Sequence, residues 1–127
     1  MRIVGHGIDL VPVERIAGML AEHGERFLLR TFTARERADC AGHRREAERL
    51  ASRFAAKEAV FKALGTGMRD GMTLLDVSVE PLATGQPTLV LAGVAAEKAR
   101  QLGITSWSVS LTDTEGYSAA SVLALGE

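Results

Sequence analysis

The sequence predicts an α+β fold, in which helices pack on a small and mostly antiparallel sheet. Helical patterns fill most of the first half of the 127-residue chain, and short β-branched runs separated by turns fill most of the second half. Helices followed by antiparallel strands in this order are typical of α+β proteins. Because no internal repeat, linker or low-complexity tract interrupts the chain, one compact domain over residues 1–127 is expected.

The first predicted element is a strand over residues 2–9, which interleaves β-branched side chains with glycines. Successive side chains of a strand point to opposite faces, so one face is expected to carry Ile3, Gly5, Gly7 and Asp9. Two glycines on this face leave room for the close approach of another backbone or of a ligand.

Helices are predicted over about residues 12–23, 33–41, 45–64 and 94–102. Pro12 suits the first turn of a helix, and Thr33 followed by Glu36 has the capping-box pattern, in which each side chain accepts from the other residue's amide. A glycine suits the left-handed position that ends a helix. Three of the predicted helices are followed by one, at Gly24, Gly65 and Gly103.

Further strands are predicted over residues 77–80, 89–91, 105–111 and 117–125. A turn at 84–87 separates the first two of these strands, and Asp113-Thr-Glu-Gly116 separates the last two. The last two strands are therefore expected to form a hairpin.

Composition and charge exclude several classes of protein. The hydrophobic content of 46% and the charged content of 24% are ordinary for a globular protein. Cys40 is the only cysteine, so no intrachain disulfide can form and a cytoplasmic location is expected. Glycine and proline interrupt the longest uncharged stretch, so we expect no membrane span, and a net charge of −1 argues against a protein that coats nucleic acid.

Charge is nevertheless distributed unevenly along the chain. Residues 26–53 contain eight arginines against four acidic residues, whereas residues 73–127 contain six acidic residues against two basic ones. Such asymmetry indicates a basic face directed at an acidic partner or at a phosphate-bearing ligand. A solvated helical face is the alternative that composition leaves open.

The helix expected over residues 45–64 carries Lys57, Glu58 and Lys62 close to its apolar stripe. On a helical wheel these charges border the core, next to the stripe formed by Leu50, Phe54 and Phe61. A Glu58–Lys62 ion pair at i,i+4 would account for two of them without any function.

Asp9 adds a second carboxylate, at the end of the glycine-containing strand. Two carboxylates together with phosphate oxygens are a usual way to hold Mg²⁺, and nearby lysines neutralise the remaining phosphate charge. Together with the glycine-rich loop that follows the helix, the combination of Asp9, Glu58 and Lys62 favours a metal-phosphate site over a surface ion pair.

Two motifs make the chain similar to a known family over nearly its whole length. Gly5-His-Gly-Ile-Asp9 resembles the N-terminal motif of the small holo-acyl-carrier-protein synthases, the short class of 4′-phosphopantetheinyl transferases. Their central signature, which is highly specific, is similar to Arg53-Phe-Ala-Ala-Lys-Glu-Ala59 with Lys62-Ala-Leu-Gly65. Smaller similarities lie at Phe32–Glu36, Asp76, Gly85–Pro87 and Val109–Thr112.

The resemblance implies the 4′-phosphopantetheinyl transferase fold, a homotrimer with its active site at the subunit interface, and coenzyme A as co-substrate. A serine of apo acyl carrier protein would attack the β-phosphate of coenzyme A, giving the modified carrier and adenosine 3′,5′-bisphosphate. Asp9 and Glu58 would bind Mg²⁺ and Lys62 would contact the pyrophosphate, which makes these three the expected catalytic residues. The residues expected to contact the coenzyme are Arg53, Lys57, Lys62, Gly65 and Asp113.

The sequence leaves open whether a carboxylate or a water molecule accepts the serine proton, and whether Mn²⁺ replaces Mg²⁺.

By the same resemblance, an acidic acyl carrier protein would dock on the first helix of the family. Arginines suit bidentate contacts with carboxylates, and Met and Phe suit an apolar anchor. Judged without the resemblance, Met19 and Phe27 fit the core as well as a docking surface. The expected docking residues are Arg15, Met19, Arg26, Phe27 and Arg30.

Asp113 departs from the family, which commonly has a histidine after the segment that matches Ser110-Leu-Thr112. An acid on the coenzyme side of the site would repel phosphate, so weak coenzyme binding, an altered base or a partly disabled enzyme all fit. Because Asp9, Glu58 and Lys62 are retained, we expect an active Mg²⁺-dependent transferase. The alternatives are a non-catalytic module that binds acyl carrier protein or coenzyme A, and another enzyme that acts on a nucleotide phosphate.

Overall fold

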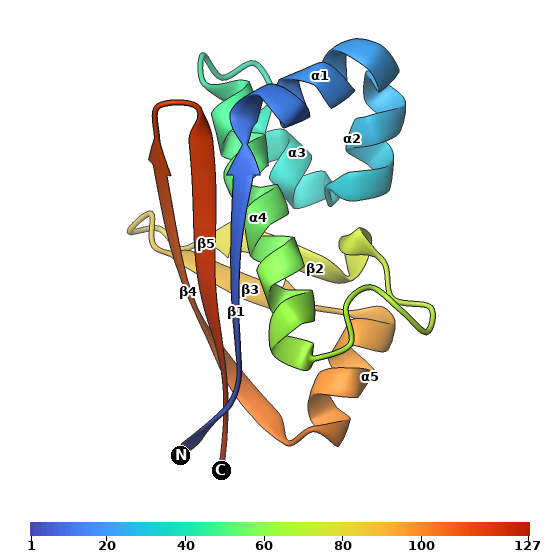
Figure 1. Cartoon of the computed structure of the whole chain (residues 1–127), viewed down its shortest axis with the longest axis vertical. Helices are drawn as coiled ribbons and strands as arrows, with labels where there is room; N and C mark the ends of the chain where they lie inside the picture. The colour runs from blue at the N-terminus through green and yellow to red at the C-terminus, as the bar shows by residue number, and fades with distance from the viewer.

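The computed structural model describes all of residues 1–127 and confirms the predicted α+β fold (Figure 1). The helices are α1 (Val13–His23), α2 (Glu25–Thr31), α3 (Ala34–Cys40), α4 (Glu46–Leu64) and α5 (Gly93–Gln101), with a 3₁₀ turn η1 (Leu74–Asp76). The strands are β1 (Arg2–Pro12), β2 (Val77–Pro81), β3 (Pro87–Leu91), β4 (Ile104–Thr114) and β5 (Tyr117–Gly126).

The strands form two antiparallel sheets, one with the order β1-β5-β4 and one made of β2 and β3. β4 and β5 are the hairpin that the sequence predicts. β1 pairs with β5 from Arg2 opposite Gly126 to Pro12 opposite Tyr117, so the two ends of the chain lie side by side (Figure 1). The outer strands β1 and β4 are therefore the two edges of the three-stranded sheet, with β5 between them.

Helix α4 packs across the inner face of this sheet and forms the centre of the core (Figure 1). Gly5 and Gly7 of β1 face the helix directly. A Cβ atom on Gly5 would collide with the carbonyl oxygen of Ala63, and one on Gly7 with that of Ala59. The predicted close approach of a backbone to these glycines is confirmed, and small side chains continue the contact on β5, at Ala120, Val122 and Ala124.

A β-bulge between Ile3 and Gly5 corrects one prediction for β1. Ile3 pairs with Leu125 and Gly5 with Ala124, which are neighbours on β5 and so point to opposite faces. The predicted place of Ile3 on the face of Gly5, Gly7 and Asp9 is wrong, because the extra residue of a bulge shifts the alternation by one.

Most predicted helix ends are confirmed, because they depend on short-range chemistry. The capping box of Thr33 and Glu36 is present, and Gly65 ends α4 in the left-handed region with a φ of 80°. No helix is predicted for α2, because it has no capping signal of the kind that marks the equally short α3. Gly24, with a φ of 52°, separates α1 from α2.

The helices lie on one side of the three-stranded sheet, and its other face is uncovered (Figure 1). On β1 this face presents large apolar side chains that are more than 60% exposed, at Ile3, Ile8 and Leu10. None of the helices combines the length and the apolar character that a membrane crossing requires.

Candidate active site

A cluster of two carboxylates and one amine lies where β1 passes α4, and we call Asp9, Glu58 and Lys62 the carboxylate cluster. The Nζ atom of Lys62 lies 2.9 Å from Oδ1 of Asp9 and donates a second hydrogen bond, also of 2.9 Å, to the carbonyl oxygen of Ile8. Lys62 thus pairs with Asp9 on the strand, and the Glu58–Lys62 pair that spacing alone allows does not form. The side chain of Lys62 is 54% exposed, so the cluster opens to solvent.

Glu58 lies one helical turn before Lys62 and is only partly exposed. Burial raises the pKa of the Glu58 carboxyl, and the negative charge of Asp9 raises it further, while Arg15 and Lys62 lower it. Asp9 has the largest of these three charge effects, and it lies on the strand face that points to α4. Such a pair of hard oxygen ligands can hold a divalent cation.

The glycines of β1 explain how Asp9 reaches the helix. Gly5, Gly7 and Asp9 share the face that points to α4, and side chains larger than hydrogen at the first two positions would separate the strand from the helix. At the other end of the cluster, Gly65 follows Lys62 by three residues, and nothing lies within 4 Å of the place where its Cβ would be. A ligand can therefore approach the end of α4 beside Lys62.

Lys57 does not lie at the border of the core, as the helical wheel predicts, and this prediction is wrong. Its side chain is fully buried, with Nζ 2.7 Å from Oε1 of Glu36 and 2.8 Å from the carbonyl oxygen of Leu74. A further hydrogen bond goes to the carbonyl oxygen of Val77. Burial lowers the pKa of the Lys57 ammonium, although the charge of Glu36 raises it. A fully buried ammonium has no surface with which to contact a coenzyme.

A second group of charged residues lines a cavity of about 800 Å³, which we call the arginine pocket. Arg45, Arg49 and Arg53 contribute one wall from the beginning of α4, at i,i+4 spacing. The remaining walls come from the β2–β3 hairpin and from the end of β4, including Asp113. Because β5 separates β4 from β1, this pocket and the carboxylate cluster lie at opposite edges of the three-stranded sheet.

Arg53 is the buried member of the arginine pocket, with only 7% of its surface exposed. Its Nη1 donates to the carbonyl oxygen of Arg49 over 3.3 Å, and its Nε has no hydrogen-bond partner. A buried guanidinium with an unpaired donor is costly unless a ligand satisfies it. Arg53 thus adds a buried positive charge to the wall of this pocket.

The predicted docking residues lie on two helices rather than one. Arg15 and Met19 belong to α1, whereas Arg26, Phe27 and Arg30 belong to α2. Phe27 is buried and meets Phe32 edge-on, with ring centroids 5.6 Å apart, so its packing in the core is confirmed. Arg15 lies over the ring of Phe54, at 5.6 Å from the centroid.

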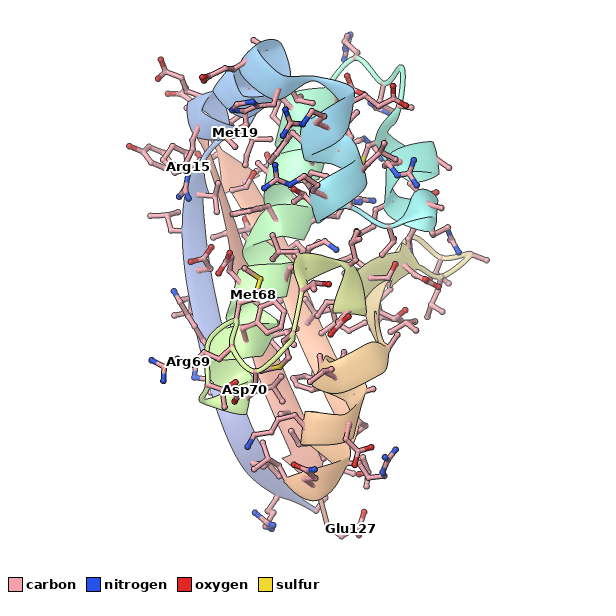
Figure 2. All side chains as sticks on the ribbon, turned by 90° about the vertical axis from the view of Figure 1, so that its right-hand side faces the viewer. Arg15, Met19, Met68, Arg69, Asp70 and Glu127 are labelled. Carbon is pink, nitrogen blue, oxygen red and sulfur yellow. The ribbon has the colours of Figure 1, made fainter.

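An apolar groove of about 410 Å³ joins these docking residues to the loop after α4. Figure 2 shows Arg15 and Met19 of α1 on the same face of the molecule as Met68 in that loop. The polar members of its lining are Arg30, His23, Thr31 and Thr73. The apolar members of the lining are Met19, Phe27, Phe54, Met68, Met72 and Leu74.

Comparison with known proteins identifies the family. Residues 5–121 match the 4′-phosphopantetheinyl transferase superfamily. The chain belongs to this superfamily. A holo-[acyl-carrier-protein] synthase of Koribacter versatilis is 46% identical over 121 residues, which cover 95% of this chain and 97% of that protein. The resemblance to this family and the enzyme class that were predicted from the sequence are confirmed. The alternative of a non-catalytic binding module is not favoured.

Solved structures of this superfamily share the fold. The holo-[acyl-carrier-protein] synthase of Neisseria meningitidis superposes with a TM-score of 0.88 at 34% identity, covering 98% of this chain and 99% of that one. The synthase of Helicobacter pylori, solved in complex with coenzyme A, superposes with a TM-score of 0.83 at 28% identity, covering 94% and 99%.

Several residues of this phosphopantetheinyl transferase were not singled out from the sequence. Arg45 and Arg49 join Arg53 in one pocket, and their i,i+4 spacing on the long helix is the signal that would have found them. Met68 and Met72 line the apolar groove from a loop whose path has no pattern in the sequence. Cys40 is buried, and burial raises the pKa of its thiol, which makes it a poor nucleophile.

Proposed function

We propose that this phosphopantetheinyl transferase moves phosphopantetheine from coenzyme A to a serine of apo acyl carrier protein and releases adenosine 3′,5′-bisphosphate. The observation that carries the proposal is the combination of the carboxylate cluster with the arginine pocket. Phosphoryl transfer needs a cation and basic side chains around the transferring and leaving phosphates, and these two groups supply both. The names of the relatives and the coenzyme complex of one neighbour support it.

The carboxylate cluster fits Mg²⁺. Asp9 and Glu58 offer two carboxylates from neighbouring elements, and the repulsion that raises the pKa of Glu58 would be relieved by a cation between them. Mg²⁺ in sites of this kind is held by one or two carboxylates together with substrate phosphates. Asp9 and Glu58 would hold the ion, which would neutralise charge on the pyrophosphate oxygens when bound.

Lys62 would contact the same pyrophosphate. An ammonium group has three N–H donors, and Lys62 uses one for Asp9 and one for the carbonyl oxygen of Ile8. The third donor and the exposed position of the side chain leave Lys62 available to a phosphate oxygen. Its positive charge would also offset the charge that develops on the leaving bisphosphate.

We place the nucleotide part of the coenzyme in the arginine pocket. The cavity of about 800 Å³ is large enough for a nucleotide, since ligand pockets span roughly 300–1,000 Å³. Arg53 adds a buried guanidinium to the wall of this pocket, and Arg49 adds a second one. Guanidinium groups bind phosphate bidentately, which suits the two phosphate positions of adenosine 3′,5′-bisphosphate.

We further propose that the site is completed between subunits of a homotrimer. The carboxylate cluster lies at the β1 edge of the sheet and the arginine pocket at the β4 edge, so neighbouring copies in a ring would bring the two groups together. The uncovered sheet face, with exposed Ile3, Ile8 and Leu10, is the apolar surface that such an assembly would bury.

The carrier would dock over α1 and α2. Arg15, Arg26 and Arg30 are exposed, and the apolar groove between Met19 and Met68 provides a place for an apolar anchor. An acidic carrier is attracted by the arginines and fixed by the groove. The cytoplasmic location expected from the sequence stays a prediction.

The test is the intact mass of an apo acyl carrier protein after incubation with this protein, coenzyme A and Mg²⁺. We expect the carrier to gain one phosphopantetheine and EDTA to prevent the gain. A carrier that binds the folded protein but gains no mass, with several apo carriers tried, would contradict the proposal and favour a binding module.

A further inference from the structure

One arginine of the arginine pocket is already engaged by carboxylates of its own chain. Nη2 of Arg45 donates to Oδ1 of Asp113 over 3.0 Å, and Nε donates to Oε2 of Glu48 over 3.2 Å. Both acids line the same pocket as Arg45. Arg49 and Arg53, in contrast, form no ion pair with any acid.

The contact with Asp113 joins two distant parts of the chain. Arg45 precedes the first residue of α4, and Asp113 lies near the end of β4, 68 residues away in sequence. Glu48, by comparison, is a local i,i+3 partner on the same helix. Asp113 also contributes most to the raised pKa of the Arg45 guanidinium. Asp113 therefore holds Arg45 across one side of the pocket.

A phosphate group that binds Arg45 at its Nε–Nη2 edge would need the donors that Glu48 and Asp113 already use. Phosphate is recognised bidentately by neighbouring N–H groups of the guanidinium, and Asp113 and Glu48 occupy Nη2 and Nε. A ligand at this edge must therefore displace a carboxylate, whereas both N–H groups of Nη1 and the second N–H of Nη2 stay free. Because the ion pair neutralises Asp113, direct repulsion of phosphate by its charge is weak as long as the pair stays closed.

We propose that Asp113 is an internal competitor for Arg45, and that it sets the affinity of the pocket for a nucleotide phosphate by occupying this guanidinium in the free protein. The identity of the ligand rests on the proposed function, whereas the competition rests on the Arg45–Asp113 contact. Asp113 would thus tune the affinity of the pocket by acting on Arg45 and not mainly through its own charge.

The experiment is a calorimetric titration with adenosine 3′,5′-bisphosphate at low ionic strength. The proteins compared are the wild type, Asp113→Asn, Arg45→Gln and the double variant that combines them. Exposed ion pairs are weak, so we expect Asp113→Asn to tighten binding about two- to five-fold. In the Arg45→Gln background, the same change should tighten binding less than in the wild type, because it then removes only the direct repulsion by the unpaired carboxylate. Glu97→Gln, which removes an exposed acid paired with Arg100 on α5, is the matched control and should leave the Kd unaltered.

Three other outcomes would contradict the competition, the role of Arg45 or the proposed function. Weaker or unchanged binding by Asp113→Asn contradicts the competition. Equal tightening with and without Arg45 shows that Asp113 repels phosphate directly, and it contradicts the role assigned to Arg45. A folded wild-type protein that does not bind the bisphosphate contradicts the proposed function itself, which separates that failure from the failure of the competition.

Discussion

At the residue scale, Glu58 is a proposed cation ligand whose ionised form destabilises the folded protein. Burial and the nearby charge of Asp9 both raise its pKa, so its ionised form is disfavoured in the folded protein. Residues that bind a cation in a partly dry site have this property, because the charge that destabilises the free protein is the charge that the cation needs. A substitution that removes the charge of Glu58 should therefore stabilise the folded protein and lower its activity.

Replacing Glu58 with Gln tests both sides of this statement. We expect transfer to fall by about 100-fold or more, in the range seen when one electrostatic group is removed from an active site. The stability of the folded protein without Mg²⁺ should rise at neutral pH, because the ionised, half-buried carboxylate is replaced by a neutral amide. The two measurements are carrier modification by intact mass and urea unfolding at two pH values, about 7.5, well above the ordinary glutamate pKa of about 4.3, and about 4, just below it.

The pH dependence of this stability difference has a definite sign. A carboxyl with a raised pKa in the folded state stabilises the fold below its ordinary pKa, and this contribution is lost as pH rises through the folded-state value. The advantage of Glu58→Gln should therefore be largest at pH about 7.5 and shrink towards pH about 4. Glu22→Gln, at a side chain that is 74% exposed, is the control and should show no such trend. If Glu58→Gln is less stable than the wild type at both pH values, the claim that burial disfavours the ionised form of Glu58 is wrong.

At the element scale, a buried ion pair ties α4 to α3 and to the second sheet. Lys57 of α4 contacts Glu36 of α3 and the carbonyl oxygens of Leu74 and Val77, while Glu36 accepts from the amide of Val79 over 2.8 Å. This network holds β2 against α4. β2 provides one wall of the arginine pocket, and α4 carries Glu58. Removing one partner of a fully buried pair leaves an uncompensated charge.

Lys57→Met is therefore expected to destabilise the protein by about 3–5 kcal/mol. Adding Glu36→Gln to Lys57→Met removes the orphaned charge and should recover part of the loss, although Glu36→Gln alone should be destabilising. Urea unfolding of the two single variants and the double variant measures the coupling. Losses that simply add would show that Lys57 and Glu36 are not a pair in solution.

The packing of β1 on α4 makes a second prediction at this scale. Gly7→Ala would place a methyl group against the carbonyl oxygen of Ala59, and neither backbone can move without separating the strand from the helix. We expect a loss of about 3 kcal/mol, at the upper end of the usual cost of overpacking. Thermal unfolding gives the value.

Gly18→Ala is the matched control for Gly7→Ala. Gly18 lies in the exposed middle of α1 with nothing within 4 Å of its missing Cβ, so alanine should stabilise the helix by about 0.5–1 kcal/mol. Similar effects of the two substitutions would contradict the close contact at Gly7.

The sequence predicts these elements well where their chemistry is local. The capping box at Thr33, the glycine that ends α4 and the glycines of β1 all follow from a few neighbouring residues. The burial of Lys57 cannot be predicted in this way, because its partner Glu36 lies in another helix and its carbonyl acceptors lie in η1 and β2. The bulge after Ile3 is missed for a similar reason, since pairing with β5 determines it.

At the scale of the whole molecule, the residues of the site separate into two groups. The resemblance to the family predicts Asp9, Glu58 and Arg53 as site residues. Only the strand order indicates that the carboxylate cluster and the arginine pocket lie at opposite edges of the three-stranded sheet. The contact between Arg45 and Asp113 likewise depends on the path of the whole chain. The two edges lead to the central claim, that one catalytic site takes its cation ligands from one subunit and its phosphate-binding arginines from the next.

Subunit mixing tests this claim most directly. Glu58→Gln removes a cation ligand and Arg53→Gln removes a phosphate ligand, so each variant alone should lose most of its activity. The two variants are co-expressed with different tags, purified through both tags, and assayed by the mass gained by an apo carrier. In every mixed trimer one of the three interfaces combines two intact halves, so activity should return to about a third of the wild type. A mixed oligomer that is no more active than its separate parents would contradict a site shared between subunits.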